Sequence, residues 1–390
     1  MSLLEGGERG GVRVAAEPAL PAVGKRLLLL LDSASGDSFW LTRALRERGV
    51  LKGYRDIPAY DMRHRTTRFG KLVLWRQYLQ LAWAGLRSSA RGDVIVSWNA
   101  VAGCLCAFLN DLLRRGRRVL ILNLIVYEKG LLHTMLRRFV YRRALASRDV
   151  AVTVNSPHLK KHYEEIYGLS IRRSHVLHDV IDTGGRVWGF HPGQGYVFCG
   201  GEARRDWGLM ADVAARLGNT AFVFAARRKG FPAMALPPNV RMVFDVPLGE
   251  FYGLLLDSSI VALPLTSHVT AGLIVLLQAA RCCKPVIMTR SPVTENYITD
   301  GKEGVLVELH DRDGMARAVG ELMADAKIRR AYAESLQRKV MADFTPEAYT
   351  ERLLSILAAW DSPSEHSGRE TAGFAGMRVG PAGRRPSSAA

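Results

Sequence analysis

Residues 264–304, PLTSHVTAGLIVLLQAARCCKPVIMTRSPVTENYITDGKEG, decide the expected fold of this 390-residue chain. The apolar run at 260–263 stops at Pro264, which is typical of a buried strand that ends at a proline. A loop of small and hydroxyl residues follows at 266–272. The apolar positions of 273–280 then predict a helix with a broad buried face. Strand, loop and helix in this order predict an α/β fold.

The second part of the same stretch repeats this pattern. Lys284-Pro285 ends the helix, because a proline clashes with the preceding helical turn, and residues 286–288 form the next short strand. Ser291-Pro292 then leads into another helix. A helix that opens directly after a strand points free N–H groups and its dipole at the carboxyl edge of the sheet. This edge is therefore a candidate phosphate site.

The segments GLIVLLQAARCCKPVI and TENYITDGKEGVLV resemble the nucleotide-sugar-binding segment of family-four glycosyltransferases. The features that follow the family's order are Lys284-Pro285, Glu295, Asp300-Gly301 and Gly304. The resemblance is close over residues 264–304 and looser over 196–360. It implies an α/β chain with the GT-B fold, in which two doubly wound Rossmann-like domains face each other across a cleft.

The resemblance also indicates which residues bind the donor. Two glycines after the strand at 196–199 let a ligand approach the backbone closely. Two arginines follow, and arginine can form forked bonds to a diphosphate. Glu202 stands where the family has an arginine, so we assign the diphosphate chiefly to Arg205. The expected donor-binding residues are Gly200, Gly201, Arg204, Arg205, Thr270, Ala271, Gly272, Gln278 and Glu295, with catalytic roles for Arg205 and Glu295.

Thr270 and Gln278 stand where the family carries a pair of glutamates. A glutamine can still form a hydrogen bond to a ribose hydroxyl, but it brings no charge. The implied reaction is hexosyl transfer from a nucleotide-diphosphate sugar with retention, in which a donor phosphate oxygen accepts the acceptor proton. Arginines, backbone N–H groups and a helix dipole then stabilise the leaving diphosphate. This scheme needs no metal and no cofactor besides the donor, and no DxD or His/Cys cluster stands where a metal would be needed.

The expected domain organisation follows from the strands and from the composition. Apolar strands at 27–31, 94–96, 119–125 and 151–154 alternate with helices, as in a parallel sheet. The segments that we expect are a disordered lead-in at 1–24, an amino-terminal acceptor domain at 25–185, a nucleotide-sugar donor domain at 186–344, a helix at 345–360 that crosses back to the first domain, and a disordered tail at 361–390. By the resemblance, the acceptor side includes Ser35, Gly36, Asp37 and His133. If the enzyme inverts instead, Asp37 or His133 would be the general base.

Positive charge gathers in the first half of the chain. The net charge is +17; residues 1–190 contain 31 lysines and arginines against 16 acidic residues, and the remainder contains 23 against 21. Such a basic half needs an acidic partner or surface. The basic, aromatic segments 63–91 and 135–144 favour a helix pair that lies on an anionic membrane. The alternative is ordinary core packing, in which one apolar stripe of the first segment faces the core: Leu72, Trp75, Leu79 and Trp83.

These features predict a peripheral protein on the cytoplasmic, inner face of the plasma membrane, with a lipid-linked sugar or polysaccharide-precursor glycan as acceptor. No apolar run is long enough to span a bilayer, and the five cysteines suggest reduced, buried thiols. Two other classes remain open. The missing glutamates would suit a GT-B-shaped scaffold without turnover. The charge would suit a nucleic-acid-binding protein, although the sequence has no such motif and we expect no nucleic acid partner.

Overall fold

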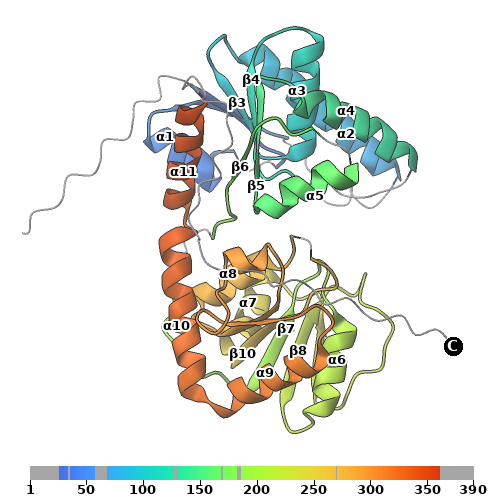
Figure 1. The fold of residues 1–390 in the computed structure, drawn as a ribbon, viewed down its shortest axis with the longest axis vertical. Helices are drawn as coiled ribbons and strands as arrows, with labels where there is room; N and C mark the ends of the chain where they lie inside the picture. The colour runs from blue at the N-terminus through green and yellow to red at the C-terminus, as the bar shows by residue number, and fades with distance from the viewer. Residues whose placement is uncertain are drawn as a thin grey trace, which may run out of the picture.

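The computed structural model describes residues 26–33, 36–57, 68–125, 131–167, 170–181, 186–268 and 270–360. The lead-in at 1–24 and the tail at 361–390 lie outside these ranges. The described chain forms two sheets of parallel strands with helices on both faces, one sheet in each half of the molecule (Figure 1).

The first sheet has the strand order β2-β1-β3-β4-β5-β6. Its strands are β1 (Leu27–Leu30), β2 (Leu51–Arg55), β3 (Val94–Ser97), β4 (Arg118–Ile121), β5 (Val150–Val154) and β6 (Ser174–Val176). Four leucines make up the whole of β1, and all are buried. An unbroken apolar strand of this kind forms in parallel sheets because helices cover both faces.

Two groups of helices cover this sheet. The helices in the first half are α1 (Trp40–Glu47), α2 (Arg68–Ser88), α3 (Ala100–Leu112), α4 (Leu131–Leu145) and α5 (Pro157–Tyr167). One face packs against α2, α3 and α4 through residues such as Ile95 and Ile121. The other face packs against α1 through Leu29 and Val96. The strand expected at 119–125 is shorter than predicted, because the chain leaves the sheet after Ile121.

The second sheet has the strand order β12-β11-β10-β7-β8-β9. Its strands are β7 (Tyr196–Gly200), β8 (Ala221–Ala226), β9 (Val240–Phe244), β10 (Ile260–Leu263), β11 (Val286–Thr289) and β12 (Val305–Val307). The helices that follow are α6 (Trp207–Arg216), α7 (Leu248–Asp257), α8 (Leu273–Arg281), α9 (Arg312–Ala324) and α10 (Ala326–Asp343). Buried side chains of this sheet pack against α6 and α9 on one face and against α8 on the other.

The two sheets point their carboxyl edges at each other. Ser156, just after β5, donates its hydroxyl hydrogen bond to the Pro292 carbonyl at 3.1 Å. Asp179, just after β6, donates its backbone N–H to the Tyr297 hydroxyl at 2.9 Å. Parallel sheets bind ligands at their carboxyl edges, so this arrangement brings both candidate binding edges to the space between the halves.

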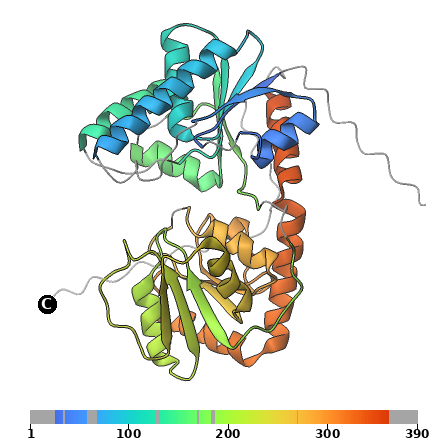
Figure 2. The same ribbon diagram turned by 180° about the vertical axis from the view of Figure 1, so that it is seen from behind.

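The chain connects the two halves at two places. The first connection follows β6, and the second is formed by α10 and α11 (Pro346–Ala359), which run along one side of both halves (Figures 1 and 2). At α11 the chain packs on the first sheet, where Tyr349 contacts Trp40 with ring centroids 5.1 Å apart. The two connections touch each other, because Ile181 donates its N–H to the Phe344 carbonyl at 2.9 Å.

Helix α2 differs from the alternative prediction that its apolar stripe faces the core. Its core-facing residues are Leu74, Tyr78, Leu81, Ala82 and Leu86, all of them buried. Leu72, Leu79 and Trp83 of the expected stripe are exposed, with 67%, 47% and 40% of their surface accessible. Trp75, the fourth member, is half-buried and packs against the core. The stripe therefore faces outward at three of its four positions.

Candidate active site

The second sheet has a topological switch point between β7 and β10. Strand order reverses there, and such points are where open α/β sheets bind ligands. The loops that leave the two strands are joined by backbone contacts: Thr266 donates to the Arg204 carbonyl at 2.9 Å, and Asp206 donates to the Pro264 carbonyl at 3.1 Å. Arg205 and Leu265 form an isolated antiparallel bridge between them. The loops therefore hold each other in place at the switch point.

Arg205 is buried at this junction with an incomplete set of partners. Only 5% of its surface is exposed, and its Nε donates to the Gly200 carbonyl at 3.0 Å. Its Nη1 is buried without a hydrogen-bond partner, and in the described part of the chain no carboxylate forms an ion pair with it. Burial lowers the pKa of the guanidinium, yet arginine stays charged in proteins. A buried, unpaired cation of this kind is unfavourable unless an anion joins it.

Two glycines line the guanidinium of Arg205. Gly201 has φ +108° and Gly272 has φ +77°, conformations that other residues rarely adopt. A Cβ atom on Gly201 would lie 2.8 Å from Nη2, and one on Gly272 would lie 3.2 Å from Nη1. Gly200 is required for a different reason, because a Cβ there would lie 2.5 Å from the ring of Phe198. The glycines that were expected at the donor site therefore surround Arg205.

Helix α8 starts at Gly272, beside the same guanidinium. No side chain caps this helix, so its first N–H groups have no side-chain acceptor. Three polar atoms of this loop and helix are buried without a partner: Ser267 Oγ, Thr270 Oγ1 and Gln278 Oε1. Ala271 between them is buried. Unpaired buried polar groups need a water or ligand partner, and the described residues show several of them along one loop and one helix.

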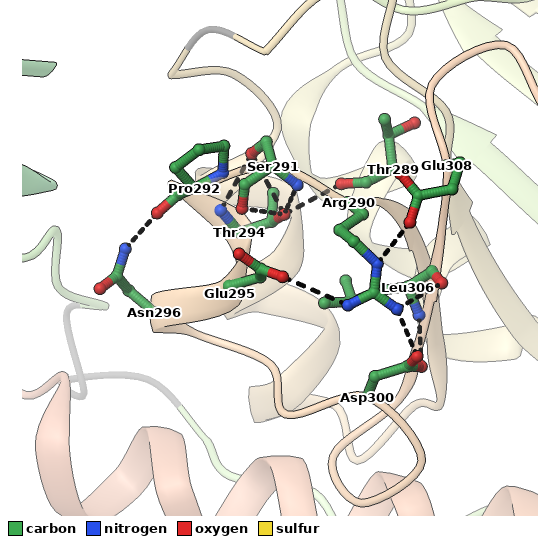
Figure 3. Close-up of polar contacts among 10 residues, drawn as sticks. All are labelled: Thr289, Arg290, Ser291, Pro292, Thr294, Glu295, Asn296, Asp300, Leu306 and Glu308. Carbon is green, nitrogen blue, oxygen red and sulfur yellow. Dashed lines mark hydrogen bonds and ion pairs between the residues drawn. The ribbon is translucent and has the colours of Figure 1, made fainter. Parts of the chain in front are cut away.

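Glu295 has a different set of neighbours from Arg205. It lies in the short helix η2 (Thr294–Asn296), and its carboxylate accepts from Arg290 Nη1 at 3.2 Å (Figure 3). Arg290 also forms ion pairs with Asp300 at 2.5 Å and with Glu308 at 2.7 Å. The catalytic role of Glu295 remains a prediction from the resemblance, because its contact in this structure is with the Arg290 cluster.

Arg204 lies outside the group around Arg205. Its side chain is exposed and its backbone is left-handed, with φ +54°. Neighbouring Glu202, which stands at the family's arginine position, forms an ion pair with Arg227 at 2.5 Å. Of the two arginines in this loop, the structure brings Arg205 and not Arg204 to the glycines.

The first sheet also has a switch point, between β1 and β3, and there sequence reasoning missed two residues. Asn99 caps α3 by accepting from the N–H groups of Val101 and Ala102, and its amide donates to Asp32 Oδ2 at 2.7 Å. Both residues directly follow a buried strand, which was the signal available in the sequence. A carboxylate and an amide at the carboxyl edge that faces the second sheet can form hydrogen bonds to sugar hydroxyls.

The residues expected on the acceptor side have varied positions. Gly36 packs against Tyr54, whose ring would lie 2.0 Å from a Cβ atom at that position. Asp37 is engaged locally: it accepts from Arg46 at 2.6 Å and from the Tyr54 hydroxyl at 2.9 Å, and the Arg46 bond in particular lowers the pKa of its carboxyl. Ser35 lies outside the described residues. His133 lies in the first turn of α4, and its side chain is likewise outside the description.

A buried polar cluster occupies the junction of the two halves. The carboxylate of Asp179 accepts from the amides of Asn155 at 2.7 Å and Asn123 at 3.1 Å. Burial raises its pKa to about 6. Burial and the nearby Arg352 lower the pKa of His178 to about 4. Two adjacent residues therefore have pKa values displaced in opposite directions.

The described residues contain neither a metal-type cluster nor a helix that could span a membrane. No three histidine, cysteine, aspartate or glutamate side chains among them gather closely enough to hold a metal ion. None of the described helices is long and apolar enough to cross a bilayer. All five cysteines are buried and free.

A protein-family model matches part of the second half of the chain. The model of the glycosyl transferases group 1 matches residues 231–339, which include α8, β11 and most of α10. Over these residues the chain is similar to the glycosyl transferases group 1. The resemblance expected from the sequence is thereby confirmed, in a form that has lost the paired glutamates.

Curated relatives match this chain over short segments. It is 33% identical over 94 residues to the lipopolysaccharide core biosynthesis glycosyltransferase LpsE of Rhizobium meliloti, which is 24% of this chain and 27% of that protein. It is 31% identical over 134 residues to the D-inositol 3-phosphate glycosyltransferase of Corynebacterium jeikeium, which is 34% of this chain and 31% of that protein. The chain thus aligns with less than a third of the length of either relative.

Solved structures match the chain over most of its length. Anabaena Alr3699/HepE in complex with UDP-glucose has a TM-score of 0.60 at 13% identity, and the match covers 85% of this chain and 99% of that one. WaaG, a glycosyltransferase involved in lipopolysaccharide biosynthesis, has a TM-score of 0.58 at 14% identity, with coverage of 85% and 99%. These likenesses show the fold, and the expected GT-B architecture is confirmed.

Proposed function

We propose that this chain is a glycosyltransferase that moves a sugar from a nucleotide-diphosphate sugar to an acceptor hydroxyl. The observation that carries the proposal is the buried, unpaired guanidinium of Arg205 between Gly201 and Gly272 at the switch point of the second sheet. A diphosphate would supply the missing negative charge. Helix α8, which starts beside Arg205, lies within the residues that match the group 1 family model, and the HepE structure of the same fold contains UDP-glucose.

The proposed reaction proceeds with retention. The bond between the anomeric carbon and the diphosphate oxygen breaks, a bond from the acceptor oxygen forms on the same face, and the acceptor proton moves to a donor phosphate oxygen. Arg205 would neutralise charge on the leaving diphosphate, and the N–H groups at the start of α8 would add the helix dipole. Removing one such donor from an oxyanion site costs about 10²–10³ in rate in other enzymes, and we expect a loss of that order for Arg205.

Neutral side chains would hold the nucleoside and the sugar. Gln278 Oε1 and Thr270 Oγ1 are buried without partners in the described structure, so each can accept a hydrogen bond from a hydroxyl of the donor. A hydrogen bond between neutral groups is about half as strong as one to a charged group. We therefore expect weaker donor binding than a chain with the two glutamates would have.

The acceptor is proposed to be a lipid-linked sugar or a polysaccharide precursor. The relative LpsE acts in lipopolysaccharide core biosynthesis according to its name. On this chain the acceptor hydroxyl would reach the donor from the carboxyl edge of the first sheet, where Asp32 and Asn99 lie 2.7 Å apart. A sugar offers the hydroxyl groups that this pair can bind.

A thermal-shift panel tests donor binding. UDP, GDP, ADP and their sugars are added to the full chain, and a diphosphate that binds the native state raises its melting temperature. The best donor is then incubated with lipid-linked acceptors, and free nucleotide is measured. No shift with any nucleotide would refute the proposal. A shift without sugar transfer or donor hydrolysis would identify a binding scaffold, and salt-sensitive binding of DNA or RNA that nucleotide sugars do not displace would identify the nucleic-acid class.

A further inference from the structure

Exposed apolar side chains are concentrated on one helical layer of the first half. Of the fourteen large apolar side chains that are exposed among the described residues, nine belong to α2, α4 and the carboxyl end of α3. We call these nine the outer apolar face: Phe69, Leu72, Leu79, Trp83, Leu112, Leu113, Met135, Leu136 and Phe139. A gathering of exposed apolar residues on one surface indicates a binding surface.

On α2 this face is separate from the buried face of the helix. Phe69, Leu72, Leu79 and Trp83 follow one another at intervals of three, seven and four residues, so they lie on one side of the helix. The opposite side, including Leu74 and Tyr78, packs on the sheet and on α3. Helix α2 is therefore apolar on both sides, and packing in the core explains only the apolar residues of its inner side.

Helix α4 has the same organisation. Met135, Leu136 and Phe139 are 69%, 64% and 59% exposed, whereas Val140 and Tyr141 are buried. The ring of the exposed Phe139 lies 6.0 Å from that of the half-buried Phe108 on α3, so α4 contacts α3 at this face. The outer apolar face is therefore formed from neighbouring helices.

The charge of these helices has one sign. Helix α2 contains four lysines and arginines, helix α4 contains four arginines, and neither contains an aspartate or glutamate. On α2, Arg76 and Arg87 continue the exposed stripe, and on α4 Arg138 lies beside Phe139; all three are exposed. Apolar side chains bordered by cations suit a surface with an anionic outer layer and an apolar interior.

The position of the helices relates this face to the candidate active site. Helix α2 follows the carboxyl end of β2 and α4 follows that of β4, so both helices begin at the edge of the sheet that faces the second half. Both project from the same corner of the first half in the two views (Figures 1 and 2). A partner surface that contacted α2 and α4 would lie next to the sheet edge where Asp32 and Asn99 are found.

We propose that the outer apolar face docks on an anionic lipid bilayer, with the apolar side chains in the headgroup and acyl boundary and the arginines on lipid phosphates. A second copy of the chain fits less well, because a two-fold interface would place the exposed cations Arg76, Arg87 and Arg138 opposite their own copies. Nucleic acid would match the charges but not the apolar residues. This docking goes beyond the proposed transfer reaction and does not depend on it.

Vesicle flotation of the full chain tests the proposal without donor or acceptor. Vesicles of phosphatidylcholine alone are compared with vesicles that contain a large fraction of phosphatidylglycerol. We expect recovery with the anionic vesicles only, decreasing as salt is raised. A basic group at such a surface is worth about fivefold in affinity, so Arg76→Gln with Arg87→Gln and Arg138→Gln should weaken binding about 100-fold.

A second variant tests the apolar side chains. Leu72→Ala with Met135→Ala and Leu136→Ala changes only exposed residues, and binding should again fall by about 100-fold. The matched apolar control is Leu248→Ala with Ile328→Ala, two exposed residues of the second half that should leave binding unchanged. The matched basic control is Arg317→Gln with Lys327→Gln and Arg338→Gln, on α9 and α10.

Several results would overturn the docking surface. Equal recovery with both kinds of vesicle, or no recovery with either, excludes an anionic bilayer as the partner. Equal loss in the variants and their controls places the contact elsewhere. A concentration-dependent dimer in light scattering that the Leu136→Ala variant abolishes, without vesicle binding, identifies a second copy as the occupant. The nucleotide-induced thermal shift should persist in all four variants, which separates failure of docking from failure of the donor site.

Discussion

Replacing Arg205 by methionine should stabilise the free protein and abolish its response to nucleotide. The guanidinium is buried, its Nη1 has no partner, and within the described ranges its side chain donates one hydrogen bond, from Nε to the Gly200 carbonyl. A buried unsatisfied polar group costs about 1–3 kcal/mol, and more when charged, whereas an ordinary hydrogen bond contributes about 1 kcal/mol. The variant removes both, so its net gain in unfolding free energy should be about 1–2 kcal/mol.

The expected readout is the melting temperature of the variant relative to the wild type. Without nucleotide the variant should melt higher than the wild type, and with nucleotide it should melt lower. For a domain of this size, 1 kcal/mol corresponds to about 2–4 °C, so ligand-free Arg205→Met should melt a few degrees above the wild type. A nucleotide diphosphate at a hundred times its dissociation constant stabilises the wild type by about 2.7 kcal/mol. The variant should lack this increase.

Arg329 provides the matched control for this experiment. It is also buried, and its Nε likewise has no partner, but its Nη1 donates to the carbonyls of Leu322 and Met323 at 2.5 and 2.8 Å at the end of α9. Arg329→Met leaves those carbonyls without their donor, so the ligand-free protein should melt lower while its nucleotide response remains. If Arg205→Met lowered the melting temperature and kept the nucleotide response, Arg205 would be a structural residue, and the proposed diphosphate site would be wrong.

Four further predictions concern the glycines, Gln278, the junction and metal dependence. Gly272→Ala should weaken nucleotide binding at least tenfold in calorimetry, because the new Cβ would lie 3.2 Å from Arg205 Nη1; Gly49→Ala also has positive φ but open space around it, and should affect stability alone. Gln278→Glu should raise nucleotide affinity severalfold through a charged hydrogen bond to the ribose, and unchanged affinity would place this side chain elsewhere. Asp179 has a raised pKa of about 6, so its contribution to the unfolding free energy decreases as pH rises from about 4 to 6. His178 has a pKa lowered to about 4, so its contribution to the unfolding free energy increases as pH rises from about 4 to 6.5. Asp179→Asn should therefore make unfolding free energy rise more steeply with pH than in the wild type, and parallel pH profiles would contradict these assignments. Transfer should also proceed at an unchanged rate after treatment with EDTA, and a loss restored by a divalent cation would rule out the metal-independent scheme.

The sequence predicted those features of the fold and the site that depend on residues close together in the chain. The strand, loop and helix at 260–281 could be predicted because proline, glycine and apolar spacing act locally, and Gly272 falls at the start of α8 as its pattern implies. Arg205 is predicted from the two glycines that precede the arginine pair and from Glu202 at the family's arginine position. Its burial and its unpaired Nη1 could only come from the structure, since they depend on packing against another loop.

Contacts between distant segments were not predictable from the same patterns. Asp32 and Asn99 are 67 residues apart in the sequence and meet because β1 and β3 are adjacent strands. Glu295 matched the family's order, but no local signal showed that Arg290 would bind it together with Asp300 and Glu308. The direction of the apolar stripe on α2 was also undetermined, because helical spacing indicates which residues share a face and not where that face points.

The contact between Ile181 and Phe344 has a consequence for movement of the two halves. Both crossings of the chain meet here, through this hydrogen bond and through the ring contact of His178 with Phe344 at 5.5 Å, so they would move together as a single hinge. A swing about this point would open or close the space between Arg205 and Asp32 while leaving both sheets intact. Sliding of one half past the other would instead pull the two crossings apart and break the bond.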